Sequence, residues 1–137
     1  MITAIDANVI LDTLVGTPEE ISVAHAALRS AEAQGGSVVS TVAYAEIAQR
    51  FQTKAKVDDF FSLLGCGIEP LDEESAFVAG QLARQYRLRG GSRTRILPDF
   101  LIGAHAQLRA DRLLTRDRRF FRDTFPKLKA VLPSELS

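Results

Sequence analysis

Short apolar runs alternate along the chain with longer segments in which apolar residues recur every three or four positions. The runs predict four strands, at residues 2–5, 37–41, 66–71 and 112–115. The periodic segments predict helices at residues 9–14, 18–34, 42–53, 56–64, 73–88 and 99–110. A short fifth strand is expected at the edge of the sheet, at residues 130–132.

Two of the helices begin with clear capping signals. Thr17 precedes Pro18 and stands three residues before Glu20, which is the pattern of a capping box with proline at the first helical position. Asp72 precedes a helix whose apolar face is expected to carry Phe77, Leu82 and Tyr86, among others. After that helix, the basic and glycine-rich residues 89–95 predict a surface loop. An arginine-rich turn is expected after Asp117.

Alternating strands and helices of these lengths predict an α/β fold, with a mostly parallel sheet of four or five strands between two helical layers. At 137 residues and 46% hydrophobic content, the chain is long enough for one domain with a substantial core, and we assign residues 1–137 to a single domain. Lysine plus arginine and aspartate plus glutamate both number 17, so the net charge indicates neither an acidic nor a basic partner.

The lone cysteine, Cys66, excludes an intramolecular disulfide and predicts a buried, unreactive thiol. His105 falls on an apolar helical stripe and is expected to be a structural histidine with a hydrogen-bond partner. The sequence has no signal-peptide pattern at Met1 and no apolar run of membrane-spanning length, so we expect a cytoplasmic protein with no membrane contact.

Four acidic residues fall at or near the predicted carboxyl ends of strands. Asp6 and Asp117 come directly after strands, Glu46 lies early in the helix that follows the second strand, and Asp99 opens the helix before the fourth. Because parallel strands end at one edge of a sheet, these side chains are expected to be neighbours. Crowded carboxylates repel one another unless a cation neutralises them, and oxygen ligands without Cys or His favour Mg²⁺ or Mn²⁺.

Each acid also has a simpler explanation. Asp99 fits a helix N-cap after Pro98, Glu46 fits a solvated position on the polar side of its helix, and Asp117 fits a turn between two arginines. Asp6 is harder to explain in this way, because a carboxylate at the end of a buried strand is costly without a partner.

Four segments of the chain, in this order and spacing, resemble the PIN-domain ribonucleases and, within them, the VapC toxins of bacterial toxin–antitoxin modules. The segments are residues 5–11 (IDANVIL), 40–46 (STVAYAE), 97–104 (LPDFLIGA) and 113–120 (LLTRDRRF). The resemblance spans nearly the whole chain. It implies a PIN-like fold and an endoribonuclease that depends on Mg²⁺ or Mn²⁺, with a cognate antitoxin and a homodimeric state.

The resemblance also implies roles for individual residues. Asp6, Glu46, Asp99 and Asp117 would be the catalytic acids and the metal ligands, with Asn8 and Thr115 in support. RNA is a polyanion, so an acidic site needs a basic surround, and Arg93, Arg95 and Arg116 are our candidate RNA-binding residues. Further arginines near them in the sequence can add to this surround: Arg89, Arg118, Arg119 and Arg122. The long basic loop before Asp99 departs from the family pattern and leaves the choice of substrate open.

Two other functions are compatible with the sequence. A PIN-like scaffold can bind RNA or a protein without cutting, although the complete set of acids argues against this. A haloacid-dehalogenase-like phosphatase also carries Asp-x-Asp after its first strand, whereas this chain has Asn8 at the second place. Neither histidine belongs to a motif with a nucleophile, so a Ser-His-Asp or Cys-His mechanism is not indicated.

Overall fold

The computed structural model describes all 137 residues and contains one sheet of five parallel strands, in the order β3-β2-β1-β4-β5. In chain order the strands are β1 Thr3–Ile5, β2 Ser37–Ser40, β3 Cys66–Glu69, β4 Arg112–Leu114 and β5 Ala130–Val131. The fifth strand lies at the edge, as predicted, and β1 is the central strand.

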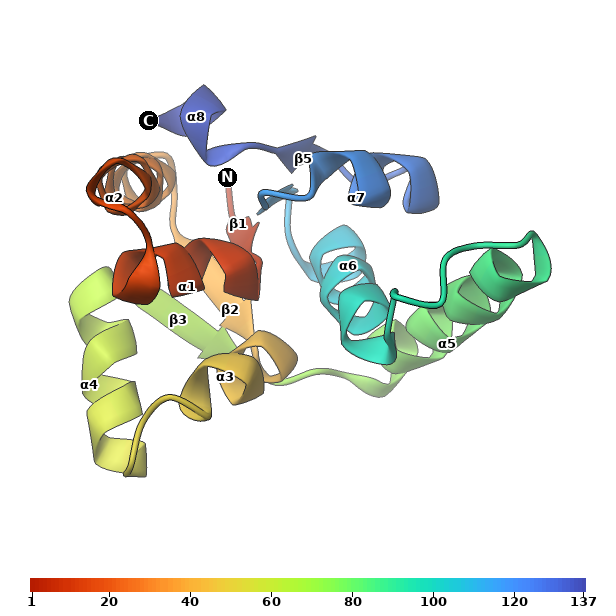
Figure 1. The fold of residues 1–137 in the computed structure, drawn as a ribbon, viewed down its shortest axis with the longest axis horizontal. Coiled ribbons are helices and arrows are strands. Elements are labelled where there is room, and N and C mark those ends of the chain that lie inside the picture. The colour runs from red at the N-terminus through yellow and green to blue at the C-terminus, as the bar shows by residue number, and fades with distance from the viewer.

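Helices flank the sheet, which confirms the predicted α/β fold of PIN-like type. They are α1 Ala7–Val15, α2 Pro18–Ala33, α3 Thr41–Ala48, α4 Lys54–Leu64, α5 Glu73–Leu88, α6 Leu97–Arg109, α7 Arg118–Thr124 and α8 Pro133–Leu136. Helices α2 and α4 lie at one end of the molecule, and α5 and α6 lie at the other, with α7 above α6 (Figure 1). No helix has the length and apolar character needed to cross a membrane.

The predicted capping signals are present. Thr17 accepts a hydrogen bond from the backbone N–H of Glu20 at 3.2 Å, and the Glu20 carboxylate accepts one from the N–H of Thr17 at 2.9 Å. Asp72 accepts from the N–H of Ser75 at 3.2 Å at the start of α5. These bonds satisfy N–H groups that the first turn of a helix leaves without partners.

Three predictions about the elements were wrong. Residues 42–53 do not form one helix, because α3 ends at Ala48 and the hydroxyl of Thr53 caps α4 by accepting from the N–H of Lys56. The expected turn after Asp117 is instead the helix α7, which is held by the buried Phe120 and Phe121. Phe77 is 67% exposed, because the small residues of α5, rather than this ring, face the core.

The predictions for the lone cysteine and for the core histidine were correct. Cys66 is buried, its sulfur accepts a hydrogen bond from the Ser37 hydroxyl at 3.4 Å, and burial raises the pKa of its thiol. His105 is 1% exposed, and its Nε2 lies 2.8 Å from Oε1 of Glu69, the last residue of β3. This contact links α6 to the sheet next to the edge where the acidic residues lie.

Candidate active site

Asp6 directly follows the central strand β1 and is only 7% exposed. Its backbone N–H continues the sheet by donating to the carbonyl of Leu114 at 2.9 Å. One carboxylate oxygen accepts a hydrogen bond from the Thr115 hydroxyl at 2.7 Å. No basic side chain pairs with this carboxylate, so a buried negative charge would have only neutral partners.

Burial raises the pKa of the Asp6 carboxyl to about 6, although the hydrogen bond from Thr115 opposes the shift, and repulsion from Asp99 adds to it. Low polarity disfavours the ionised carboxylate, and a nearby negative charge disfavours it further. The Asp6 carboxyl therefore has a proton affinity well above that of an exposed aspartate. A cation in the same place would relieve the same cost.

Glu46 and Asp99 lie close enough to Asp6 to affect its ionisation or be affected by it. Glu46, in the second turn of α3, is half-buried rather than fully solvated. Burial, followed by repulsion from Asp6 and from Asp99, raises the pKa of its carboxyl. The structure therefore brings three of the four predicted acids into one region of negative charge.

Asp99 is not the N-cap of its helix. Helix α6 begins at Leu97 after Ile96, and Asp99 is its third residue, where Oδ2 accepts a hydrogen bond from the N–H of Ile96 at 3.2 Å. One carboxylate oxygen therefore has a local structural partner. The N-cap explanation of Asp99 is therefore wrong, although its carboxylate does accept a backbone hydrogen bond at the start of the helix, and its charge also repels those of Asp6 and Glu46.

Asp117 has a different environment from the other three acids. Its carboxylate forms an ion pair with Arg95, and the two side chains are 32% and 28% exposed. The guanidinium of Arg95 also lies over the ring of Phe120, with 4.1 Å from its central carbon to the ring centre. The charge of Asp117 is thus already compensated by an arginine of the loop that precedes α6.

The residues predicted to support the acids connect the end of β4 to the start of α1. The Thr115 hydroxyl donates to Asp6 and accepts from the backbone N–H of Asp117 at 2.9 Å. Asn8 Oδ1 accepts from the backbone N–H of Arg116 at 3.2 Å. Thr115 and Asn8 therefore fix the chain after β4 in place against the first strand and helix.

The donor set fits a divalent cation by its chemistry, since the oxygens of Asp6 and Glu46 are partly buried, mutually repulsive and without basic partners. The positions of the side chains are looser than this chemistry suggests. No three or more of the acidic, histidine or cysteine side chains converge tightly enough to hold a metal ion as they stand. A cation would have to draw the acids together.

Two cavities each include one of the acids in their lining. One of about 500 Å³ lies between α1 and α3 and is lined in part by Asn8, Glu46 and Arg50. Another, of about 400 Å³, lies between α5 and α7 and includes Arg95 and Asp117 in its lining.

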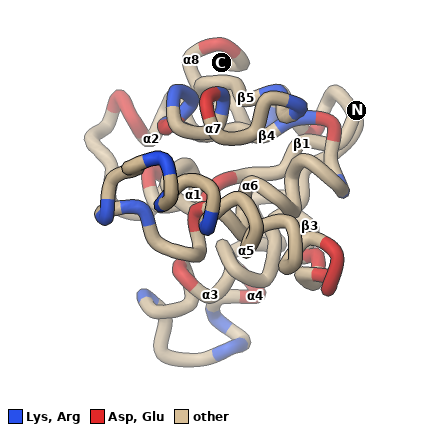
Figure 2. Tube along the Cα trace, turned by 90° about the vertical axis from the view of Figure 1, so that its right-hand side faces the viewer, with Lys and Arg blue, Asp and Glu red and all other residues tan.

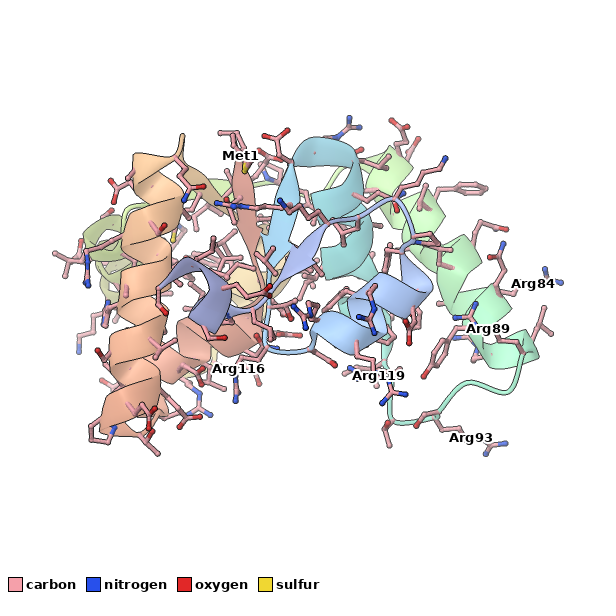
Figure 3. The ribbon with its side chains drawn as sticks, turned by 90° about the horizontal axis from the view of Figure 1, so that it is seen from above. Met1, Arg84, Arg89, Arg93, Arg116 and Arg119 are labelled. Atoms are coloured by element: carbon pink, nitrogen blue, oxygen red, sulfur yellow. The ribbon has the colours of Figure 1, made fainter.

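The three predicted RNA-binding arginines lie in different surroundings. Arg93 is exposed in the loop between α5 and α6, and Arg95 is paired with Asp117. Arg116 points elsewhere: its guanidinium lies 3.0 Å from the buried Asp12 and 3.7 Å from Glu20, next to α2. In Figure 3 Arg116 lies apart from Arg93, although Arg116 and Arg119 line one cavity together with Asp117.

Nothing in the sequence indicates the ion pair between Arg116 and Asp12. Asp12 lies in the middle of α1, among residues that predict only a short helix. Burial raises the pKa of its carboxyl, and the Arg116 guanidinium opposes that shift. The contact suits a structural role, in which it holds the segment after β4 against α1.

In open α/β sheets, ligands bind beyond the carboxyl ends of the strands, which is where Asp6 lies in this protein. The PIN domain family model matches residues 3–124, and the chain belongs to this family. No curated protein sequence matches the chain.

Several solved structures share the fold. VapBC2 from Rickettsia felis, bound to a DNA fragment from its promoter, matches with a TM-score of 0.72 and 19% identity, over 96% of this chain and 98% of that one. VapBC-1 from nontypeable Haemophilus influenzae matches with a TM-score of 0.71 and 21% identity, over 98% and 99%. FitAcB from Neisseria gonorrhoeae matches with a TM-score of 0.66 and 21% identity, over 97% and 98%. These likenesses support the assigned fold over nearly the full length of the chain.

Proposed function

We propose that this protein is a metal-dependent endoribonuclease of the PIN family and the toxin of a toxin–antitoxin pair. The observation that carries the nuclease proposal is the buried Asp6, which shares a region of negative charge with Glu46 and Asp99 and has no basic partner. Buried carboxylates that repel one another destabilise the fold unless a cation neutralises them. The toxin proposal is supported by the full-length likeness to VapBC and FitAB complexes.

Mg²⁺ or Mn²⁺ would be held by Asp6, Glu46 and Asp99, with Asp117 as a further ligand when it is released from Arg95. Such an ion supplies a water of lowered pKa and offsets the charge that develops on the scissile phosphate. Thr115 keeps the Asp6 carboxylate oriented, and Asn8 keeps the backbone after β4 in place. The arginines near the loop of residues 89–95 bind the RNA phosphates.

The likeness to the same complexes supports a proposal about a partner. A cognate antitoxin would bind this chain and block the site. We also propose a homodimer, which the resemblance in the sequence implies. Measuring the mass of the purified protein, alone and after co-expression with a candidate antitoxin, checks both proposals.

The decisive experiment compares wild type with Asp6→Asn on labelled RNA in the presence of Mg²⁺, Mn²⁺ or EDTA. The amide is nearly isosteric with the carboxylate and can still accept from Thr115, but it lacks the charge that holds a hard cation. We expect metal-dependent cleavage by wild type, none by the variant, and equal RNA binding by both.

Asp111→Asn is a matched control, because Asp111 is exposed before β4 and accepts a hydrogen bond from the N–H of Ile2 at 2.6 Å, outside the region of the four acids. This variant should cut RNA like wild type. Cleavage by Asp6→Asn at near the wild-type rate would remove Asp6 from the site. RNA binding by wild type without cleavage under any metal condition would favour a catalytically silent RNA-binding module.

A further inference from the structure

A cavity of about 400 Å³ borders the acidic residues on the side of α5 and α7. Asp117, one of the four predicted acids, is part of the cavity wall, so the cavity lies directly beside that acid. The other lining residues come from the end of α5, the following loop and α7: Tyr86, Arg89, Arg95, Arg119, Phe120, Asp123 and Thr124. A volume of this size lies within the range of small-ligand sites.

The cavity has an excess of positive charge. Of its three arginines, Arg95 is paired with Asp117, while the remaining acid, Asp123, lies 3.6 Å from Arg122 outside the cavity. Arg89 and Arg119 are exposed and form no ion pair. Two uncompensated guanidinium groups therefore remain for an anionic ligand.

More arginines lie outside the cavity on the same side of the molecule. Figure 3 shows Arg84, Arg89, Arg93 and Arg119 at the end of the molecule formed by α5, its loop and α7. Figure 2 shows basic positions along the same part of the chain. The cavity is therefore the recess of a wider basic surface, and a long polyanion would meet this surface around it.

The walls of the cavity are flat and already held in place. The Tyr86 and Phe120 rings meet edge to face, with their centres 5.8 Å apart, and the guanidinium of Arg89 lies 5.3 Å from the centre of the Tyr86 ring. The loop folds back onto the same ring, because the N–H of Ser92 donates to the Tyr86 hydroxyl at 3.1 Å. Little ordering is therefore needed before a ligand binds.

We propose that this cavity binds one unpaired nucleotide of the substrate RNA, next to the scissile phosphate. The proposal rests on the function proposed above. Arg89 and Arg119 bind the phosphate of that nucleotide, and its base stacks on the guanidinium plane of Arg95 or Arg89, which the aromatic rings support from below. An unpaired base fits better than a paired one, because a base inside a helix cannot enter a recess of this size.

The test combines protein variants with shortened substrates. Once the cleavage site in an oligoribonucleotide has been mapped, substrates are made that end one nucleotide sooner on the 5′ or on the 3′ side of the cut. The protein variant carries Arg89→Ala and Arg119→Ala. The control carries Arg29→Ala and Lys56→Ala, which also removes two exposed basic side chains without an acidic partner, but on α2 and α4 at the other end of the molecule (Figure 1).

For wild type, removing the nucleotide on one side of the cut should lower kcat/KM by about a hundredfold, since each lost charged hydrogen bond is worth about tenfold. The Arg89→Ala, Arg119→Ala variant should lose about the same factor on the full substrate and almost nothing more on the short one. The control should keep the wild-type ratio between the two substrates. Equal melting temperatures show that each variant is folded. Arg119→Ala alone, which leaves the contact between Arg89 and Tyr86 in place, should show about half of the effect on a logarithmic scale.

The outcomes separate this proposal from the function on which it rests. If wild type cuts no RNA with Mg²⁺ or Mn²⁺, the proposed function fails. If wild type cuts RNA but the cavity variant and the control show the same ratio between long and short substrates, the subsite is overturned while the nuclease stands. A cavity variant that loses only its binding to a protein partner, with an unchanged ratio, would assign the recess to that partner.

Discussion

Asp6 and Asp117 follow neighbouring strands at the same edge of the sheet, yet their carboxylates are in opposite electrostatic states. Asp6 is buried, bound to a hydroxyl and close to other acids, and the pKa of its carboxyl is raised to about 6. Asp117 is one-third exposed and paired with Arg95. Asp6 has no basic partner, whereas Asp117 forms an ion pair with an arginine.

Two acids at equivalent positions in the sheet can therefore differ in whether their carboxylates are free to bind a cation. Two of the three acids near one another, Asp6 and Glu46, have raised pKa values because burial and mutual repulsion penalise their charges. The ion pair at Asp117 removes the fourth acid from this group. We infer that cation binding involves an exchange, in which Asp117 leaves Arg95 and joins the other acids.

The largest effect on stability should come from removing the negative charge of Asp6 in the absence of metal. Between about pH 4 and 6 the folded protein keeps a proton on Asp6 that the unfolded chain releases, so stability falls as the pH rises through this window. At pH 7 the full cost is present, and Asp6→Asn should raise the free energy of unfolding by an amount on the order of 2 kcal/mol.

Asp117→Asn should have the opposite sign, with a loss of about 1 kcal/mol or less, because it leaves Arg95 without its partner. Urea unfolding in EDTA at pH 4, 5, 6 and 7 measures both variants. The wild type should lose stability between about pH 4 and 6, and the Asp6→Asn profile should be flatter. Two variants that change stability in the same direction at pH 7 would end the contrast between the two acids.

A smaller effect is expected on metal affinity when Arg95 is replaced. Arg95→Met keeps an apolar side chain over Phe120 and removes the cation that competes for Asp117, so Mn²⁺ should bind about tenfold more tightly, or roughly 1.4 kcal/mol. Calorimetric titration of the metal into the RNA-free protein measures the change. Arg93→Met is the matched control, because Arg93 lies in the same loop and is exposed. Equal Mn²⁺ affinities for both variants would show that Arg95 does not regulate access to Asp117.

The smallest effect is expected from Thr115→Val, which changes the hydrogen bonding but no charge. The hydroxyl donates to Asp6 and thereby lowers the pKa of that carboxyl, so its loss should raise the pKa further and move the stability profile towards higher pH. The N–H of Asp117 would also lose its acceptor, at a cost of about 1 kcal/mol. Thr13→Val, in α1, is the control, since that hydroxyl donates only to the Ile10 carbonyl. An unmoved profile would show that Thr115 does not set the ionisation of Asp6.

Much of the fold could be predicted from the sequence because the signals are local. The capping box at Thr17 and the cap at Asp72 placed α2 and α5 within a residue or two at their starts. The prediction failed where a local pattern was outweighed by tertiary contacts. Helix α7 contains three arginines and forms because Phe120 and Phe121 are buried, which the sequence of that segment alone does not indicate.

The placement of two of the candidate acids was predictable for the same reason. The positions of Asp6 and Asp117 after strands are local facts, and a parallel sheet brings them to one edge. Their ion pairs are not local. Asp117 pairs with Arg95, which depends on the path of the loop after α5, and Arg116 pairs with the buried Asp12 of α1. The sequence could therefore predict that Asp6 and Asp117 lie at one edge of the sheet, but not that Asp117 forms an ion pair with Arg95.

The order of the strands also determines when the site can exist. Strand β1 is made first, but one of its two neighbours, β4, comes from residues 112–114, and the hydroxyl that binds Asp6 comes from Thr115. A growing chain on the ribosome therefore carries Asp6, Glu46 and Asp99 before the strand that completes their surroundings has emerged. The site therefore cannot be assembled until most of the polypeptide has been synthesised.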